Sequence, residues 1–324
     1  MKQLQRLVYV CALCIAVPAS TCAFAAEAER QVAVTVDDLP ADAAFSMTAA
    51  SITEVNIKLL ANLRDEKIPA VGFVNERKLY QWGEVDPRIK ALAMWPDAGF
   101  ELGNHGFSHL SLNEAGLKAW EDDVIHGENV ISLLLAEHKM KPRYFRHPFL
   151  ATGRDLETRR QAEAFLTGRG YRIAPVTIDP WDWMFSPVYA DAKKRGDVAL
   201  EQEVVKSYLA YADAVFAYDE QLSREILGYE PRQILLLHDS QLNADHLKDL
   251  VAVIRKRGYK FITLADALSD PAYSMPDTFV ADDGSGWLDH WAITMGKPPN
   301  PKNYPAVPAA IEERYNKLPN ALDY

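Results

Sequence analysis

The sequence predicts an α/β fold in which seven strands alternate with helices, as in a parallel barrel. Short runs rich in β-branched and aromatic residues alternate with longer segments of helical period, which is typical of consecutive βα units. Several of the short runs stop at acidic, histidine or arginine residues. The chain has 324 residues, which is long enough for one large α/β domain with a well-buried core.

The repeat can be followed from the N-terminal side to about residue 270. The predicted strands cover residues 31–36, 70–74, 100–102, 143–145, part of 171–178, 233–237 and 259–262. The predicted helices cover residues 47–66, 87–97, 113–138, 155–168, 243–257 and 264–268. Glycines at 168 and 258 mark two helix ends that are followed by strands.

Two segments do not fit the repeat. Residues 186–230 form an insertion whose middle has helical spacing, and we expect it to pack a helix against the barrel wall or to help hold a substrate. Residues 271–324 are rich in Pro, Gly and Asn with scattered aromatic residues, which predicts an irregular C-terminal extension packed on the barrel. In this extension, Trp287, Asp289, His290 and Trp291 could pack in the core or form an exposed stacking edge.

The N-terminus has the layout of a secretory signal peptide. Lys2 and Arg6 precede an apolar run that ends in Ala23-Phe24-Ala25, and this run is too short to span a bilayer comfortably. Cleavage after Ala25 would leave the barrel at 26–270 and an extension at 271–324. Lipidation at Cys22 is an alternative. We expect a periplasmic or secreted protein with no membrane span in its mature form.

Composition narrows the classes of partner and of metal site. The net charge is −10, and removal of the two basic residues of the signal peptide makes it more negative. This balance argues against nucleic acid, because phosphate binding requires clustered Lys and Arg. All three cysteines, at 11, 14 and 22, lie in the segment predicted to be removed, so a thiolate metal site is excluded from the mature chain.

Side chains able to do chemistry follow five of the predicted strands directly. They are Asp37 and Asp38, His105 and His109, Arg146, Asp179 and Asp182, and His238 and Asp239. Because the carboxyl ends of successive parallel strands open onto one face, we expect these side chains to converge.

Part of this set has the composition of a metal site. His105 and His109 stand four residues apart, so on a helical turn both imidazoles would face the same side. Asp38 adds a carboxylate, and two histidines with one carboxylate are a common ligand set for a divalent metal. Asp37 and Asp38 are adjacent carboxylates, which disfavour joint ionisation unless a cation lies between them. Each feature alone also fits a surface or capping residue, and their combination indicates the metal.

These residues, in this order, resemble the five motifs of the polysaccharide deacetylase family, also called the NodB homology domain or carbohydrate esterase family four. The motifs read Thr-Val-Asp37-Asp38, His105-x-x-x-His109, Arg146-x-Pro148-Phe149, Asp179-x-x-Asp182-Trp183 and Leu236-x-His238. The similarity runs from about residue 32 to residue 239, with a last βα unit to about 270. It implies a distorted (β/α)7 barrel.

The resemblance also implies a role for each matched residue. The metal ligands would be Asp38, His105 and His109, and the metal zinc first, with cobalt, nickel or manganese as alternatives. The catalytic residues would be Asp37 as the base acting on metal-bound water, His238 as the acid, Arg146 holding the base and Asp182 supporting the acid. Substrate would contact Phe149, Trp183, His147 and Pro148.

The implied function is a secreted metal-dependent hydrolase that removes N-acetyl groups from an amino-sugar glycan or oligosaccharide. An O-acetyl polysaccharide esterase and a non-catalytic glycan-binding module are the alternatives. Three positions depart from the family pattern: Leu39 before Pro40, Gly106 after His105, and Leu150 after Phe149. None is a proposed ligand or proton-transfer group, so the departures concern the shape of the groove and hence the substrate.

Overall fold

A computed structural model of the protein describes residues 29–318. The predicted signal peptide and the three cysteines lie outside the described residues. Seven strands form one parallel sheet: β1 (Gln31–Leu39), β2 (Ala70–Val74), β3 (Glu101–Asn104), β4 (Tyr144–Phe145), β5 (Arg172–Ile173), β6 (Gln233–His238) and β7 (Lys260–Phe261). The strand order is β5-β4-β3-β2-β1-β6, with β7 paired to the start of β1. The seven predicted strands are therefore confirmed.

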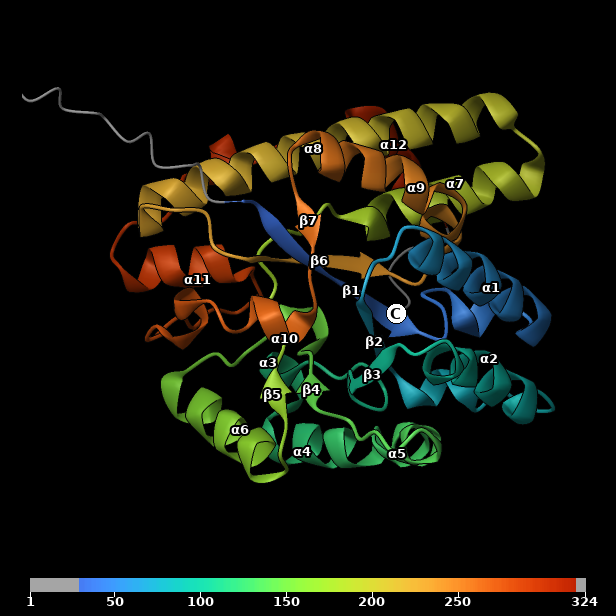
Figure 1. Ribbon diagram of the computed structural model, residues 1–324, viewed down its shortest axis with the longest axis horizontal. Helices are drawn as coiled ribbons and strands as arrows, with labels where there is room; N and C mark the ends of the chain where they lie inside the picture. The colour runs from blue at the N-terminus through green and yellow to red at the C-terminus, as the bar shows by residue number, and fades with distance from the viewer. Residues whose placement is uncertain (1–28, 319–324) are drawn as a thin grey trace, which may run out of the picture.

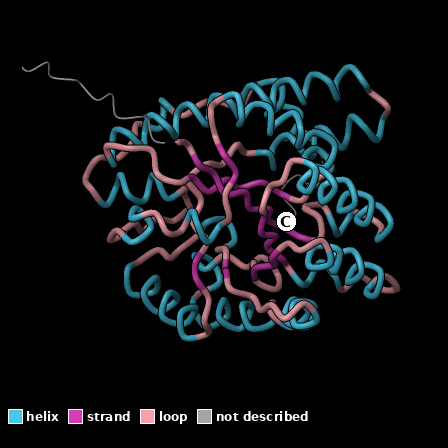
Figure 2. Tube along the Cα trace, viewed as in Figure 1, coloured by secondary structure: helices cyan, strands magenta, loops and turns pink. Residues whose placement is uncertain are grey.

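The sheet curls into a half-barrel that helices surround, which confirms the distorted (β/α) barrel (Figures 1 and 2). Beyond β5, the chain leaves β4 and turns to β6, where Ile178 forms a parallel bridge with Leu235. The Ile178 amide donates to the Ile234 carbonyl at 3.1 Å, and the Leu236 amide donates to the Ile178 carbonyl at 3.0 Å. The predicted strand at 171–178 is thus split between two neighbours, which distorts the barrel.

Alternation along β1 divides its side chains between the helices and the barrel interior. Val32, Val34 and Val36 belong to the large core packed against the surrounding helices. Ala33 belongs to a second core inside the curl of the sheet, closed at one end by α10 (Leu264–Ala267). Thr35 and Asp37 continue this inner row toward the carboxyl end of the strand.

The helices that follow the first strands agree with the predicted βα units. They are α1 (Ala49–Asp65), α2 (Val85–Asp97), α6 (Leu156–Gly168) and α9 (Gln241–Lys256). One prediction was wrong in detail, because the helix expected at 113–138 is three helices: α3 (Leu112–Ala115), α4 (Leu117–His126) and α5 (Asn129–Glu137). Gly116 has a φ of 78°, which ends the first. At Gly127 a β-carbon would lie 2.6 Å from the Gly106 backbone, so the second helix ends against the loop that carries the two histidines.

The insertion is a helical hairpin of α7 (Asp182–Arg195) and α8 (Val198–Leu227), joined at Gly196. The long α8 crosses the top of the molecule in Figure 1. The extension is more regular than expected, since it contains α11 (Trp287–Thr294) and α12 (Ala309–Tyr315). Trp287, His290 and Trp291 are buried, so these residues pack in the core and do not form an exposed stacking edge.

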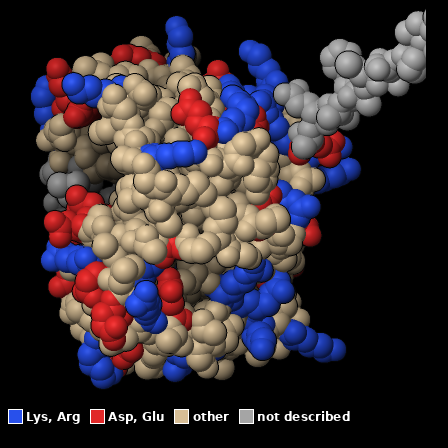
Figure 3. Space-filling model, turned by 90° about the vertical axis from the view of Figure 1, so that its left-hand side faces the viewer, with Lys and Arg blue, Asp and Glu red and all other residues tan. Residues whose placement is uncertain are grey.

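On the face that Figure 3 shows, basic and acidic side chains are mixed around the rim of an uncharged central area. Within residues 29–318, no helix combines the length and the apolar character that crossing a bilayer requires.

Candidate active site

A bulge in β1 lets two adjacent carboxylates face the same site. The pairing of β1 with β2 jumps from Val36↔Gly72 to Leu39↔Val74, so two residues of β1 stand against one of β2. Asp38 has a φ of 69°, in the left-handed region. Bulges of this kind redirect side chains at the end of a strand. Asp37 and Asp38 are both about 98% buried or more, and each has its own set of partners.

The two histidines lie on a loop after β3 and not on the helical turn that their spacing suggested. Gly106 and His109 have φ values of 75° and 60°, which a helix does not allow. The imidazole rings still lie side by side, with centroids 4.8 Å apart. The Asp123 carboxylate of α4 holds this loop by accepting hydrogen bonds from the backbone amides of Phe107 and Ser108 and from the Ser108 hydroxyl.

Asp38, His105 and His109 form a cluster that fits a metal ion. Their ligand atoms lie within 4.8 Å of one another, and no other group of this kind occurs in the described part of the chain. The Nε2 atoms of His105 and His109 lie 3.8 and 3.7 Å from Asp38 Oδ1. Both carboxylate oxygens of Asp38 are buried without a hydrogen bond among residues 29–318. A cation would satisfy them.

The protonation of the cluster also fits a metal. His105 donates from Nδ1 to the Arg146 carbonyl at 2.8 Å, which leaves the Nε2 lone pair directed at the cluster. Burial lowers the pKa of His105, and burial lowers the pKa of His109 to about 4, so both imidazoles are neutral, as ligands must be. For Asp38, burial is outweighed by Lys78 and the histidines, and its pKa lies below the ordinary range.

Lys78 is a buried cation that the sequence analysis did not single out. It follows β2 in the 3-10 helix η2 (Glu76–Leu79) and is 2% exposed. Its Nζ lies 3.4 Å from Asp38 Oδ2 and 3.3 Å from the carbonyl oxygens of Asp38 and Asp42. Lys78 therefore engages one carboxylate oxygen of Asp38, while the other faces the histidines.

Asp37 and Arg146 form a buried pair on the inner face of the sheet. Arg146 is fully buried, and its Nη1 lies 3.3 Å from Asp37 Oδ2, while Nη2 donates to the Thr35 hydroxyl at 2.8 Å. Because Thr35 and Asp37 are two residues apart on one strand, the guanidinium spans both. Burial raises the pKa of Asp37 to about 6, against the opposing charge of Arg146.

His238 stands beside Asp37 because their strands are neighbours. The two residues are partners in the register of β1 and β6. Asp182, at the start of α7, accepts from His238 Nδ1 and from the His238 backbone amide, both at 2.7 Å, and Asn243 donates to the same carboxylate. Burial alone would lower the pKa of His238, but the Asp182 charge and hydrogen bond raise it to about 10.

One cavity of about 1060 Å³ is lined by Asp37, Asp38, His105, His109 and His238. Of the predicted substrate contacts, Phe149 is 53% exposed and stacks edge-on against the His109 ring at 4.3 Å. Trp183 and His147 line the cavity as well, although His147 is buried and stacked on Trp120. Pro148 is buried and begins the 3-10 helix η3 (Pro148–Leu150). Pro148 is not among the lining residues of the described chain.

The insertion and the extension form the remaining walls of the cavity. Tyr218 and Asp219 come from α8, and Asp289 and Tyr304 come from the extension. At Gly284 a β-carbon would lie 1.9 Å from the Phe149 carbonyl oxygen. The extension therefore rests on the backbone of η3, which only a glycine allows.

The family model of polysaccharide deacetylases matches residues 25–165. This match confirms the family resemblance that the motifs indicate. The search among curated proteins found no match.

Similar solved structures include the polysaccharide deacetylase Bc1974 from Bacillus cereus, with 15% identity, a TM-score of 0.49, and 72% of this chain and 91% of that chain covered. The peptidoglycan deacetylase PdaC from Bacillus subtilis has 19% identity, a TM-score of 0.45 and coverages of 74% and 90%. BA3943 from Bacillus anthracis, described as a pseudoenzyme, has 17% identity, a TM-score of 0.48 and coverages of 75% and 67%.

Proposed function

We propose that the protein is a metal-dependent hydrolase that removes acetyl groups from the nitrogen of amino sugars in a glycan. The observation that carries this proposal is the pairing of Asp37 with His238 on adjacent strand ends, beside the cluster of Asp38, His105 and His109. A proton acceptor and a proton donor thus flank three metal ligands. The match to the polysaccharide deacetylase family supports the same reaction class.

The protein groups divide the proton transfers between them. A divalent ion held by Asp38, His105 and His109, with zinc the first choice, would polarise the acetyl carbonyl and lower the pKa of bound water toward 7. Asp37, with a pKa of about 6, is ionised at neutral pH and accepts a proton from the attacking water. Arg146 fixes the position of that carboxylate.

His238 supplies the proton that the leaving nitrogen needs. Its pKa of about 10 keeps the imidazolium populated at neutral pH, and Asp182 stabilises that cation. An amine is a poor leaving group unless it is protonated, whereas an alcohol leaves more easily. A strongly protonated acid therefore favours amide hydrolysis over the alternative of an O-acetyl esterase.

The test measures acetate release from N-acetylated chito-oligosaccharides by purified protein. We expect activity that a chelator abolishes and zinc restores. Asp37→Asn should lower kcat by about 10²- to 10⁴-fold, since it removes the general base. Asp86→Asn, an exposed change at the start of α2, is the matched control and should be neutral. O-acetylated sugars tested in parallel separate the amidase from the esterase. Tight glycan binding by zinc-loaded protein without any product would contradict the proposal.

The proposal includes export from the cytoplasm, because residues 1–25 have the layout of a signal peptide. N-terminal sequencing of the protein recovered outside the cytoplasm should begin near residue 26. A protein that keeps Met1 and stays in the cytoplasm would contradict the export.

A further inference from the structure

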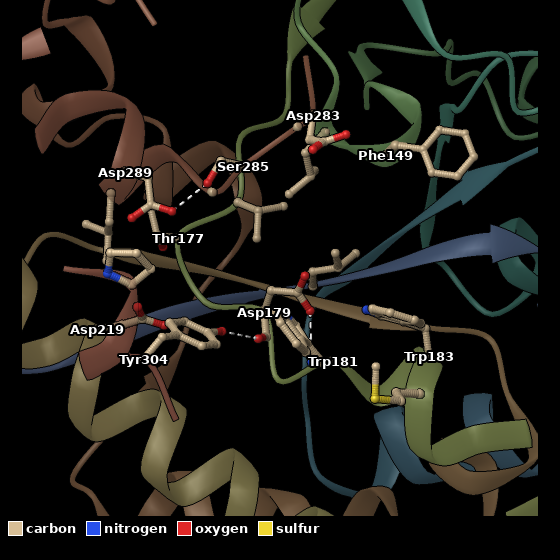
Figure 4. A pocket seen from close by; sticks show the side chains of 18 of the residues that line it. Phe149, Thr177, Asp179, Trp181, Trp183, Asp219, Asp283, Ser285, Asp289 and Tyr304 are labelled. Atoms are coloured by element: carbon tan, nitrogen blue, oxygen red, sulfur yellow. Dashed lines mark hydrogen bonds between the residues drawn. The ribbon is translucent and has the colours of Figure 1, made fainter. Parts of the chain in front are cut away.

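One end of the cavity is acidic and aromatic. Asp179, Asp219 and Asp289 line it, while no Lys or Arg lines the cavity within residues 29–318. Figure 4 shows Asp219, Asp289 and Tyr304 at the end of the cavity away from Phe149 and Trp183, with Asp179 between the two ends. The acidic end is therefore separate from the catalytic end but continuous with it.

Asp219 is the residue that indicates a binding site. It lies on α8, is 5% exposed and lines the cavity. Its carboxylate has no hydrogen bond or ion pair with any residue from 29 to 318. Burial raises its pKa well above the ordinary value, and the charges of Asp289 and Asp179 add to this effect. Burial therefore favours the protonated form of this carboxyl group, and a cation that reached it would favour the carboxylate.

The neighbouring groups suit an organic cation. Tyr304 donates its hydroxyl to the Asp179 carbonyl at 3.0 Å, and its ring lies 5.4 Å from that of Trp181 and 5.1 Å from that of Tyr218. Aromatic faces beside carboxylates attract ammonium groups. Ser285 hydrogen-bonds one oxygen of Asp289, and the second oxygen of that carboxylate stays available.

A metal ion does not fit the acidic end. Asp179, Asp219 and Asp289 do not form a group that could hold a metal ion, since the Asp38 cluster is the single group of that kind in the described chain. A larger cation with its charge on one substituent fits a cavity of about 1060 Å³.

We infer that the acidic end of the cavity binds a primary ammonium group of the substrate. This inference rests on the proposed function, and it narrows the substrate to a glycan in which a sugar with a free amine lies beside the N-acetylated sugar. A glycan with carboxylates at that position would meet Asp179, Asp219 and Asp289 and be repelled. An acyclic N-acetylated diamine offers the same ammonium group and is the alternative source.

The first test measures binding to zinc-loaded protein by calorimetry, with the glucosamine dimer as the cationic probe and the diacetylated dimer as the neutral one. We expect the cationic dimer to bind about tenfold more tightly, consistent with one partly buried charge interaction. Asp219→Asn should abolish this preference without changing the affinity for the neutral dimer. Asp213→Asn, an exposed change on the same helix, should preserve it. Equal affinity of wild-type protein for the two dimers would overturn the inference.

The second test compares kcat/KM for the mono-acetylated dimer, the diacetylated dimer and mono-acetylated 1,4-diaminobutane. The wild type should favour the mono-acetylated dimer about tenfold, and Asp219→Asn should remove the difference. Faster hydrolysis of the acyclic amine would overturn the amino-sugar assignment. If the protein binds the cationic dimer more tightly but hydrolyses none of the substrates, only the deacetylase function is contradicted. If it hydrolyses the substrates without any preference for the ammonium group, only the ammonium site is contradicted.

Discussion

At the scale of single residues, the protonation of His238 depends on Asp182. The carboxylate accepts from the imidazole Nδ1 and from the backbone amide of the same residue, so it fixes both the ring and its charge. The raised pKa of His238, about 10, contributes stability that is fully present below pH 6.5 and is lost as the pH rises through 10. The acid should stay protonated over the same range.

Asp182→Asn should therefore move the alkaline limb of the pH–rate profile from near pH 10 to lower pH by more than one unit. It should also lower kcat at pH 8, because less of the acid is protonated. The measurement is kcat from pH 6 to 11 on an N-acetylated oligosaccharide. Asp191→Asn, at a half-exposed position on α7 that pairs with Arg195, is the control and should keep the wild-type profile. An unmoved alkaline limb would show that His238 is not the group that titrates.

At the scale of elements, the cluster of Asp38, His105 and His109 depends on the loop between β3 and α3. Gly106 sits in this loop with a φ of 75°, and a β-carbon there would lie 2.6 Å from Asp123 Oδ2. The Asp123 carboxylate is held by hydrogen bonds to Phe107 and Ser108, so it cannot move aside freely. This contact and the positive φ both favour glycine at position 106.

Gly106→Ala should weaken zinc binding by about 10- to 100-fold, the usual effect of disturbing groups that orient metal ligands. Gly99→Ala is the matched control: Gly99 also has a positive φ, of 86°, but nothing lies within 4 Å of its added β-carbon. Both variants share the backbone strain, and only Gly106→Ala displaces Asp123. Zinc affinity measured by competition with a chelator checks this, and equal affinities of the two variants would contradict it.

The sequence predicts the elements better than it predicts the walls of the site. Polar residues at strand ends indicated Asp37, Asp38, His105, Arg146 and His238, because parallel strands place their carboxyl ends together. The same rule applied to β2 would have found Lys78, three residues beyond Asn75 at the strand end.

Other site residues have no such signal. Asp123 and Asn243 lie on helices, where a single acid or amide is usually solvated, and their role depends on which loop packs against the helix. Asp219 and Asp289 reach the cavity only through long-range packing of α8 and α11, which no local pattern of residues encodes. The prediction of a single helix at 113–138 was wrong for a similar reason, since Gly127 packs against the loop that contains Gly106.

At the scale of the whole molecule, buried charges fasten the extension to the barrel. Arg159 of α6 is 4% exposed and donates from both terminal nitrogens to Asp277, at 2.9 and 2.5 Å. His290 of α11 donates to the same carboxylate at 2.9 Å. Burial raises the pKa of Asp277, but His290 and Arg159 lower it by more, so the pKa lies below its ordinary range. Its stabilising effect is present above pH 4 and is lost only in stronger acid.

Asp277→Asn should lower the free energy of unfolding by about 3 kcal/mol at pH 7, because it leaves the buried Arg159 charge without its more buried carboxylate partner. Glu163→Gln removes the other, more exposed partner of Arg159 and should cost less than about 1 kcal/mol. Urea unfolding of both variants checks the difference. Equal losses would show that the Asp277 pair does not hold the extension.

The close approach of Gly284 to the Phe149 carbonyl limits which sequences can replace the C-terminal extension. The residues proposed for catalysis and the C-terminal extension lie in separate stretches of the chain, so other extensions could be joined to this barrel without changing those residues. Any replacement tail must cross η3 with a residue that has no side chain at this point. One glycine thus limits which extensions can pack on this barrel.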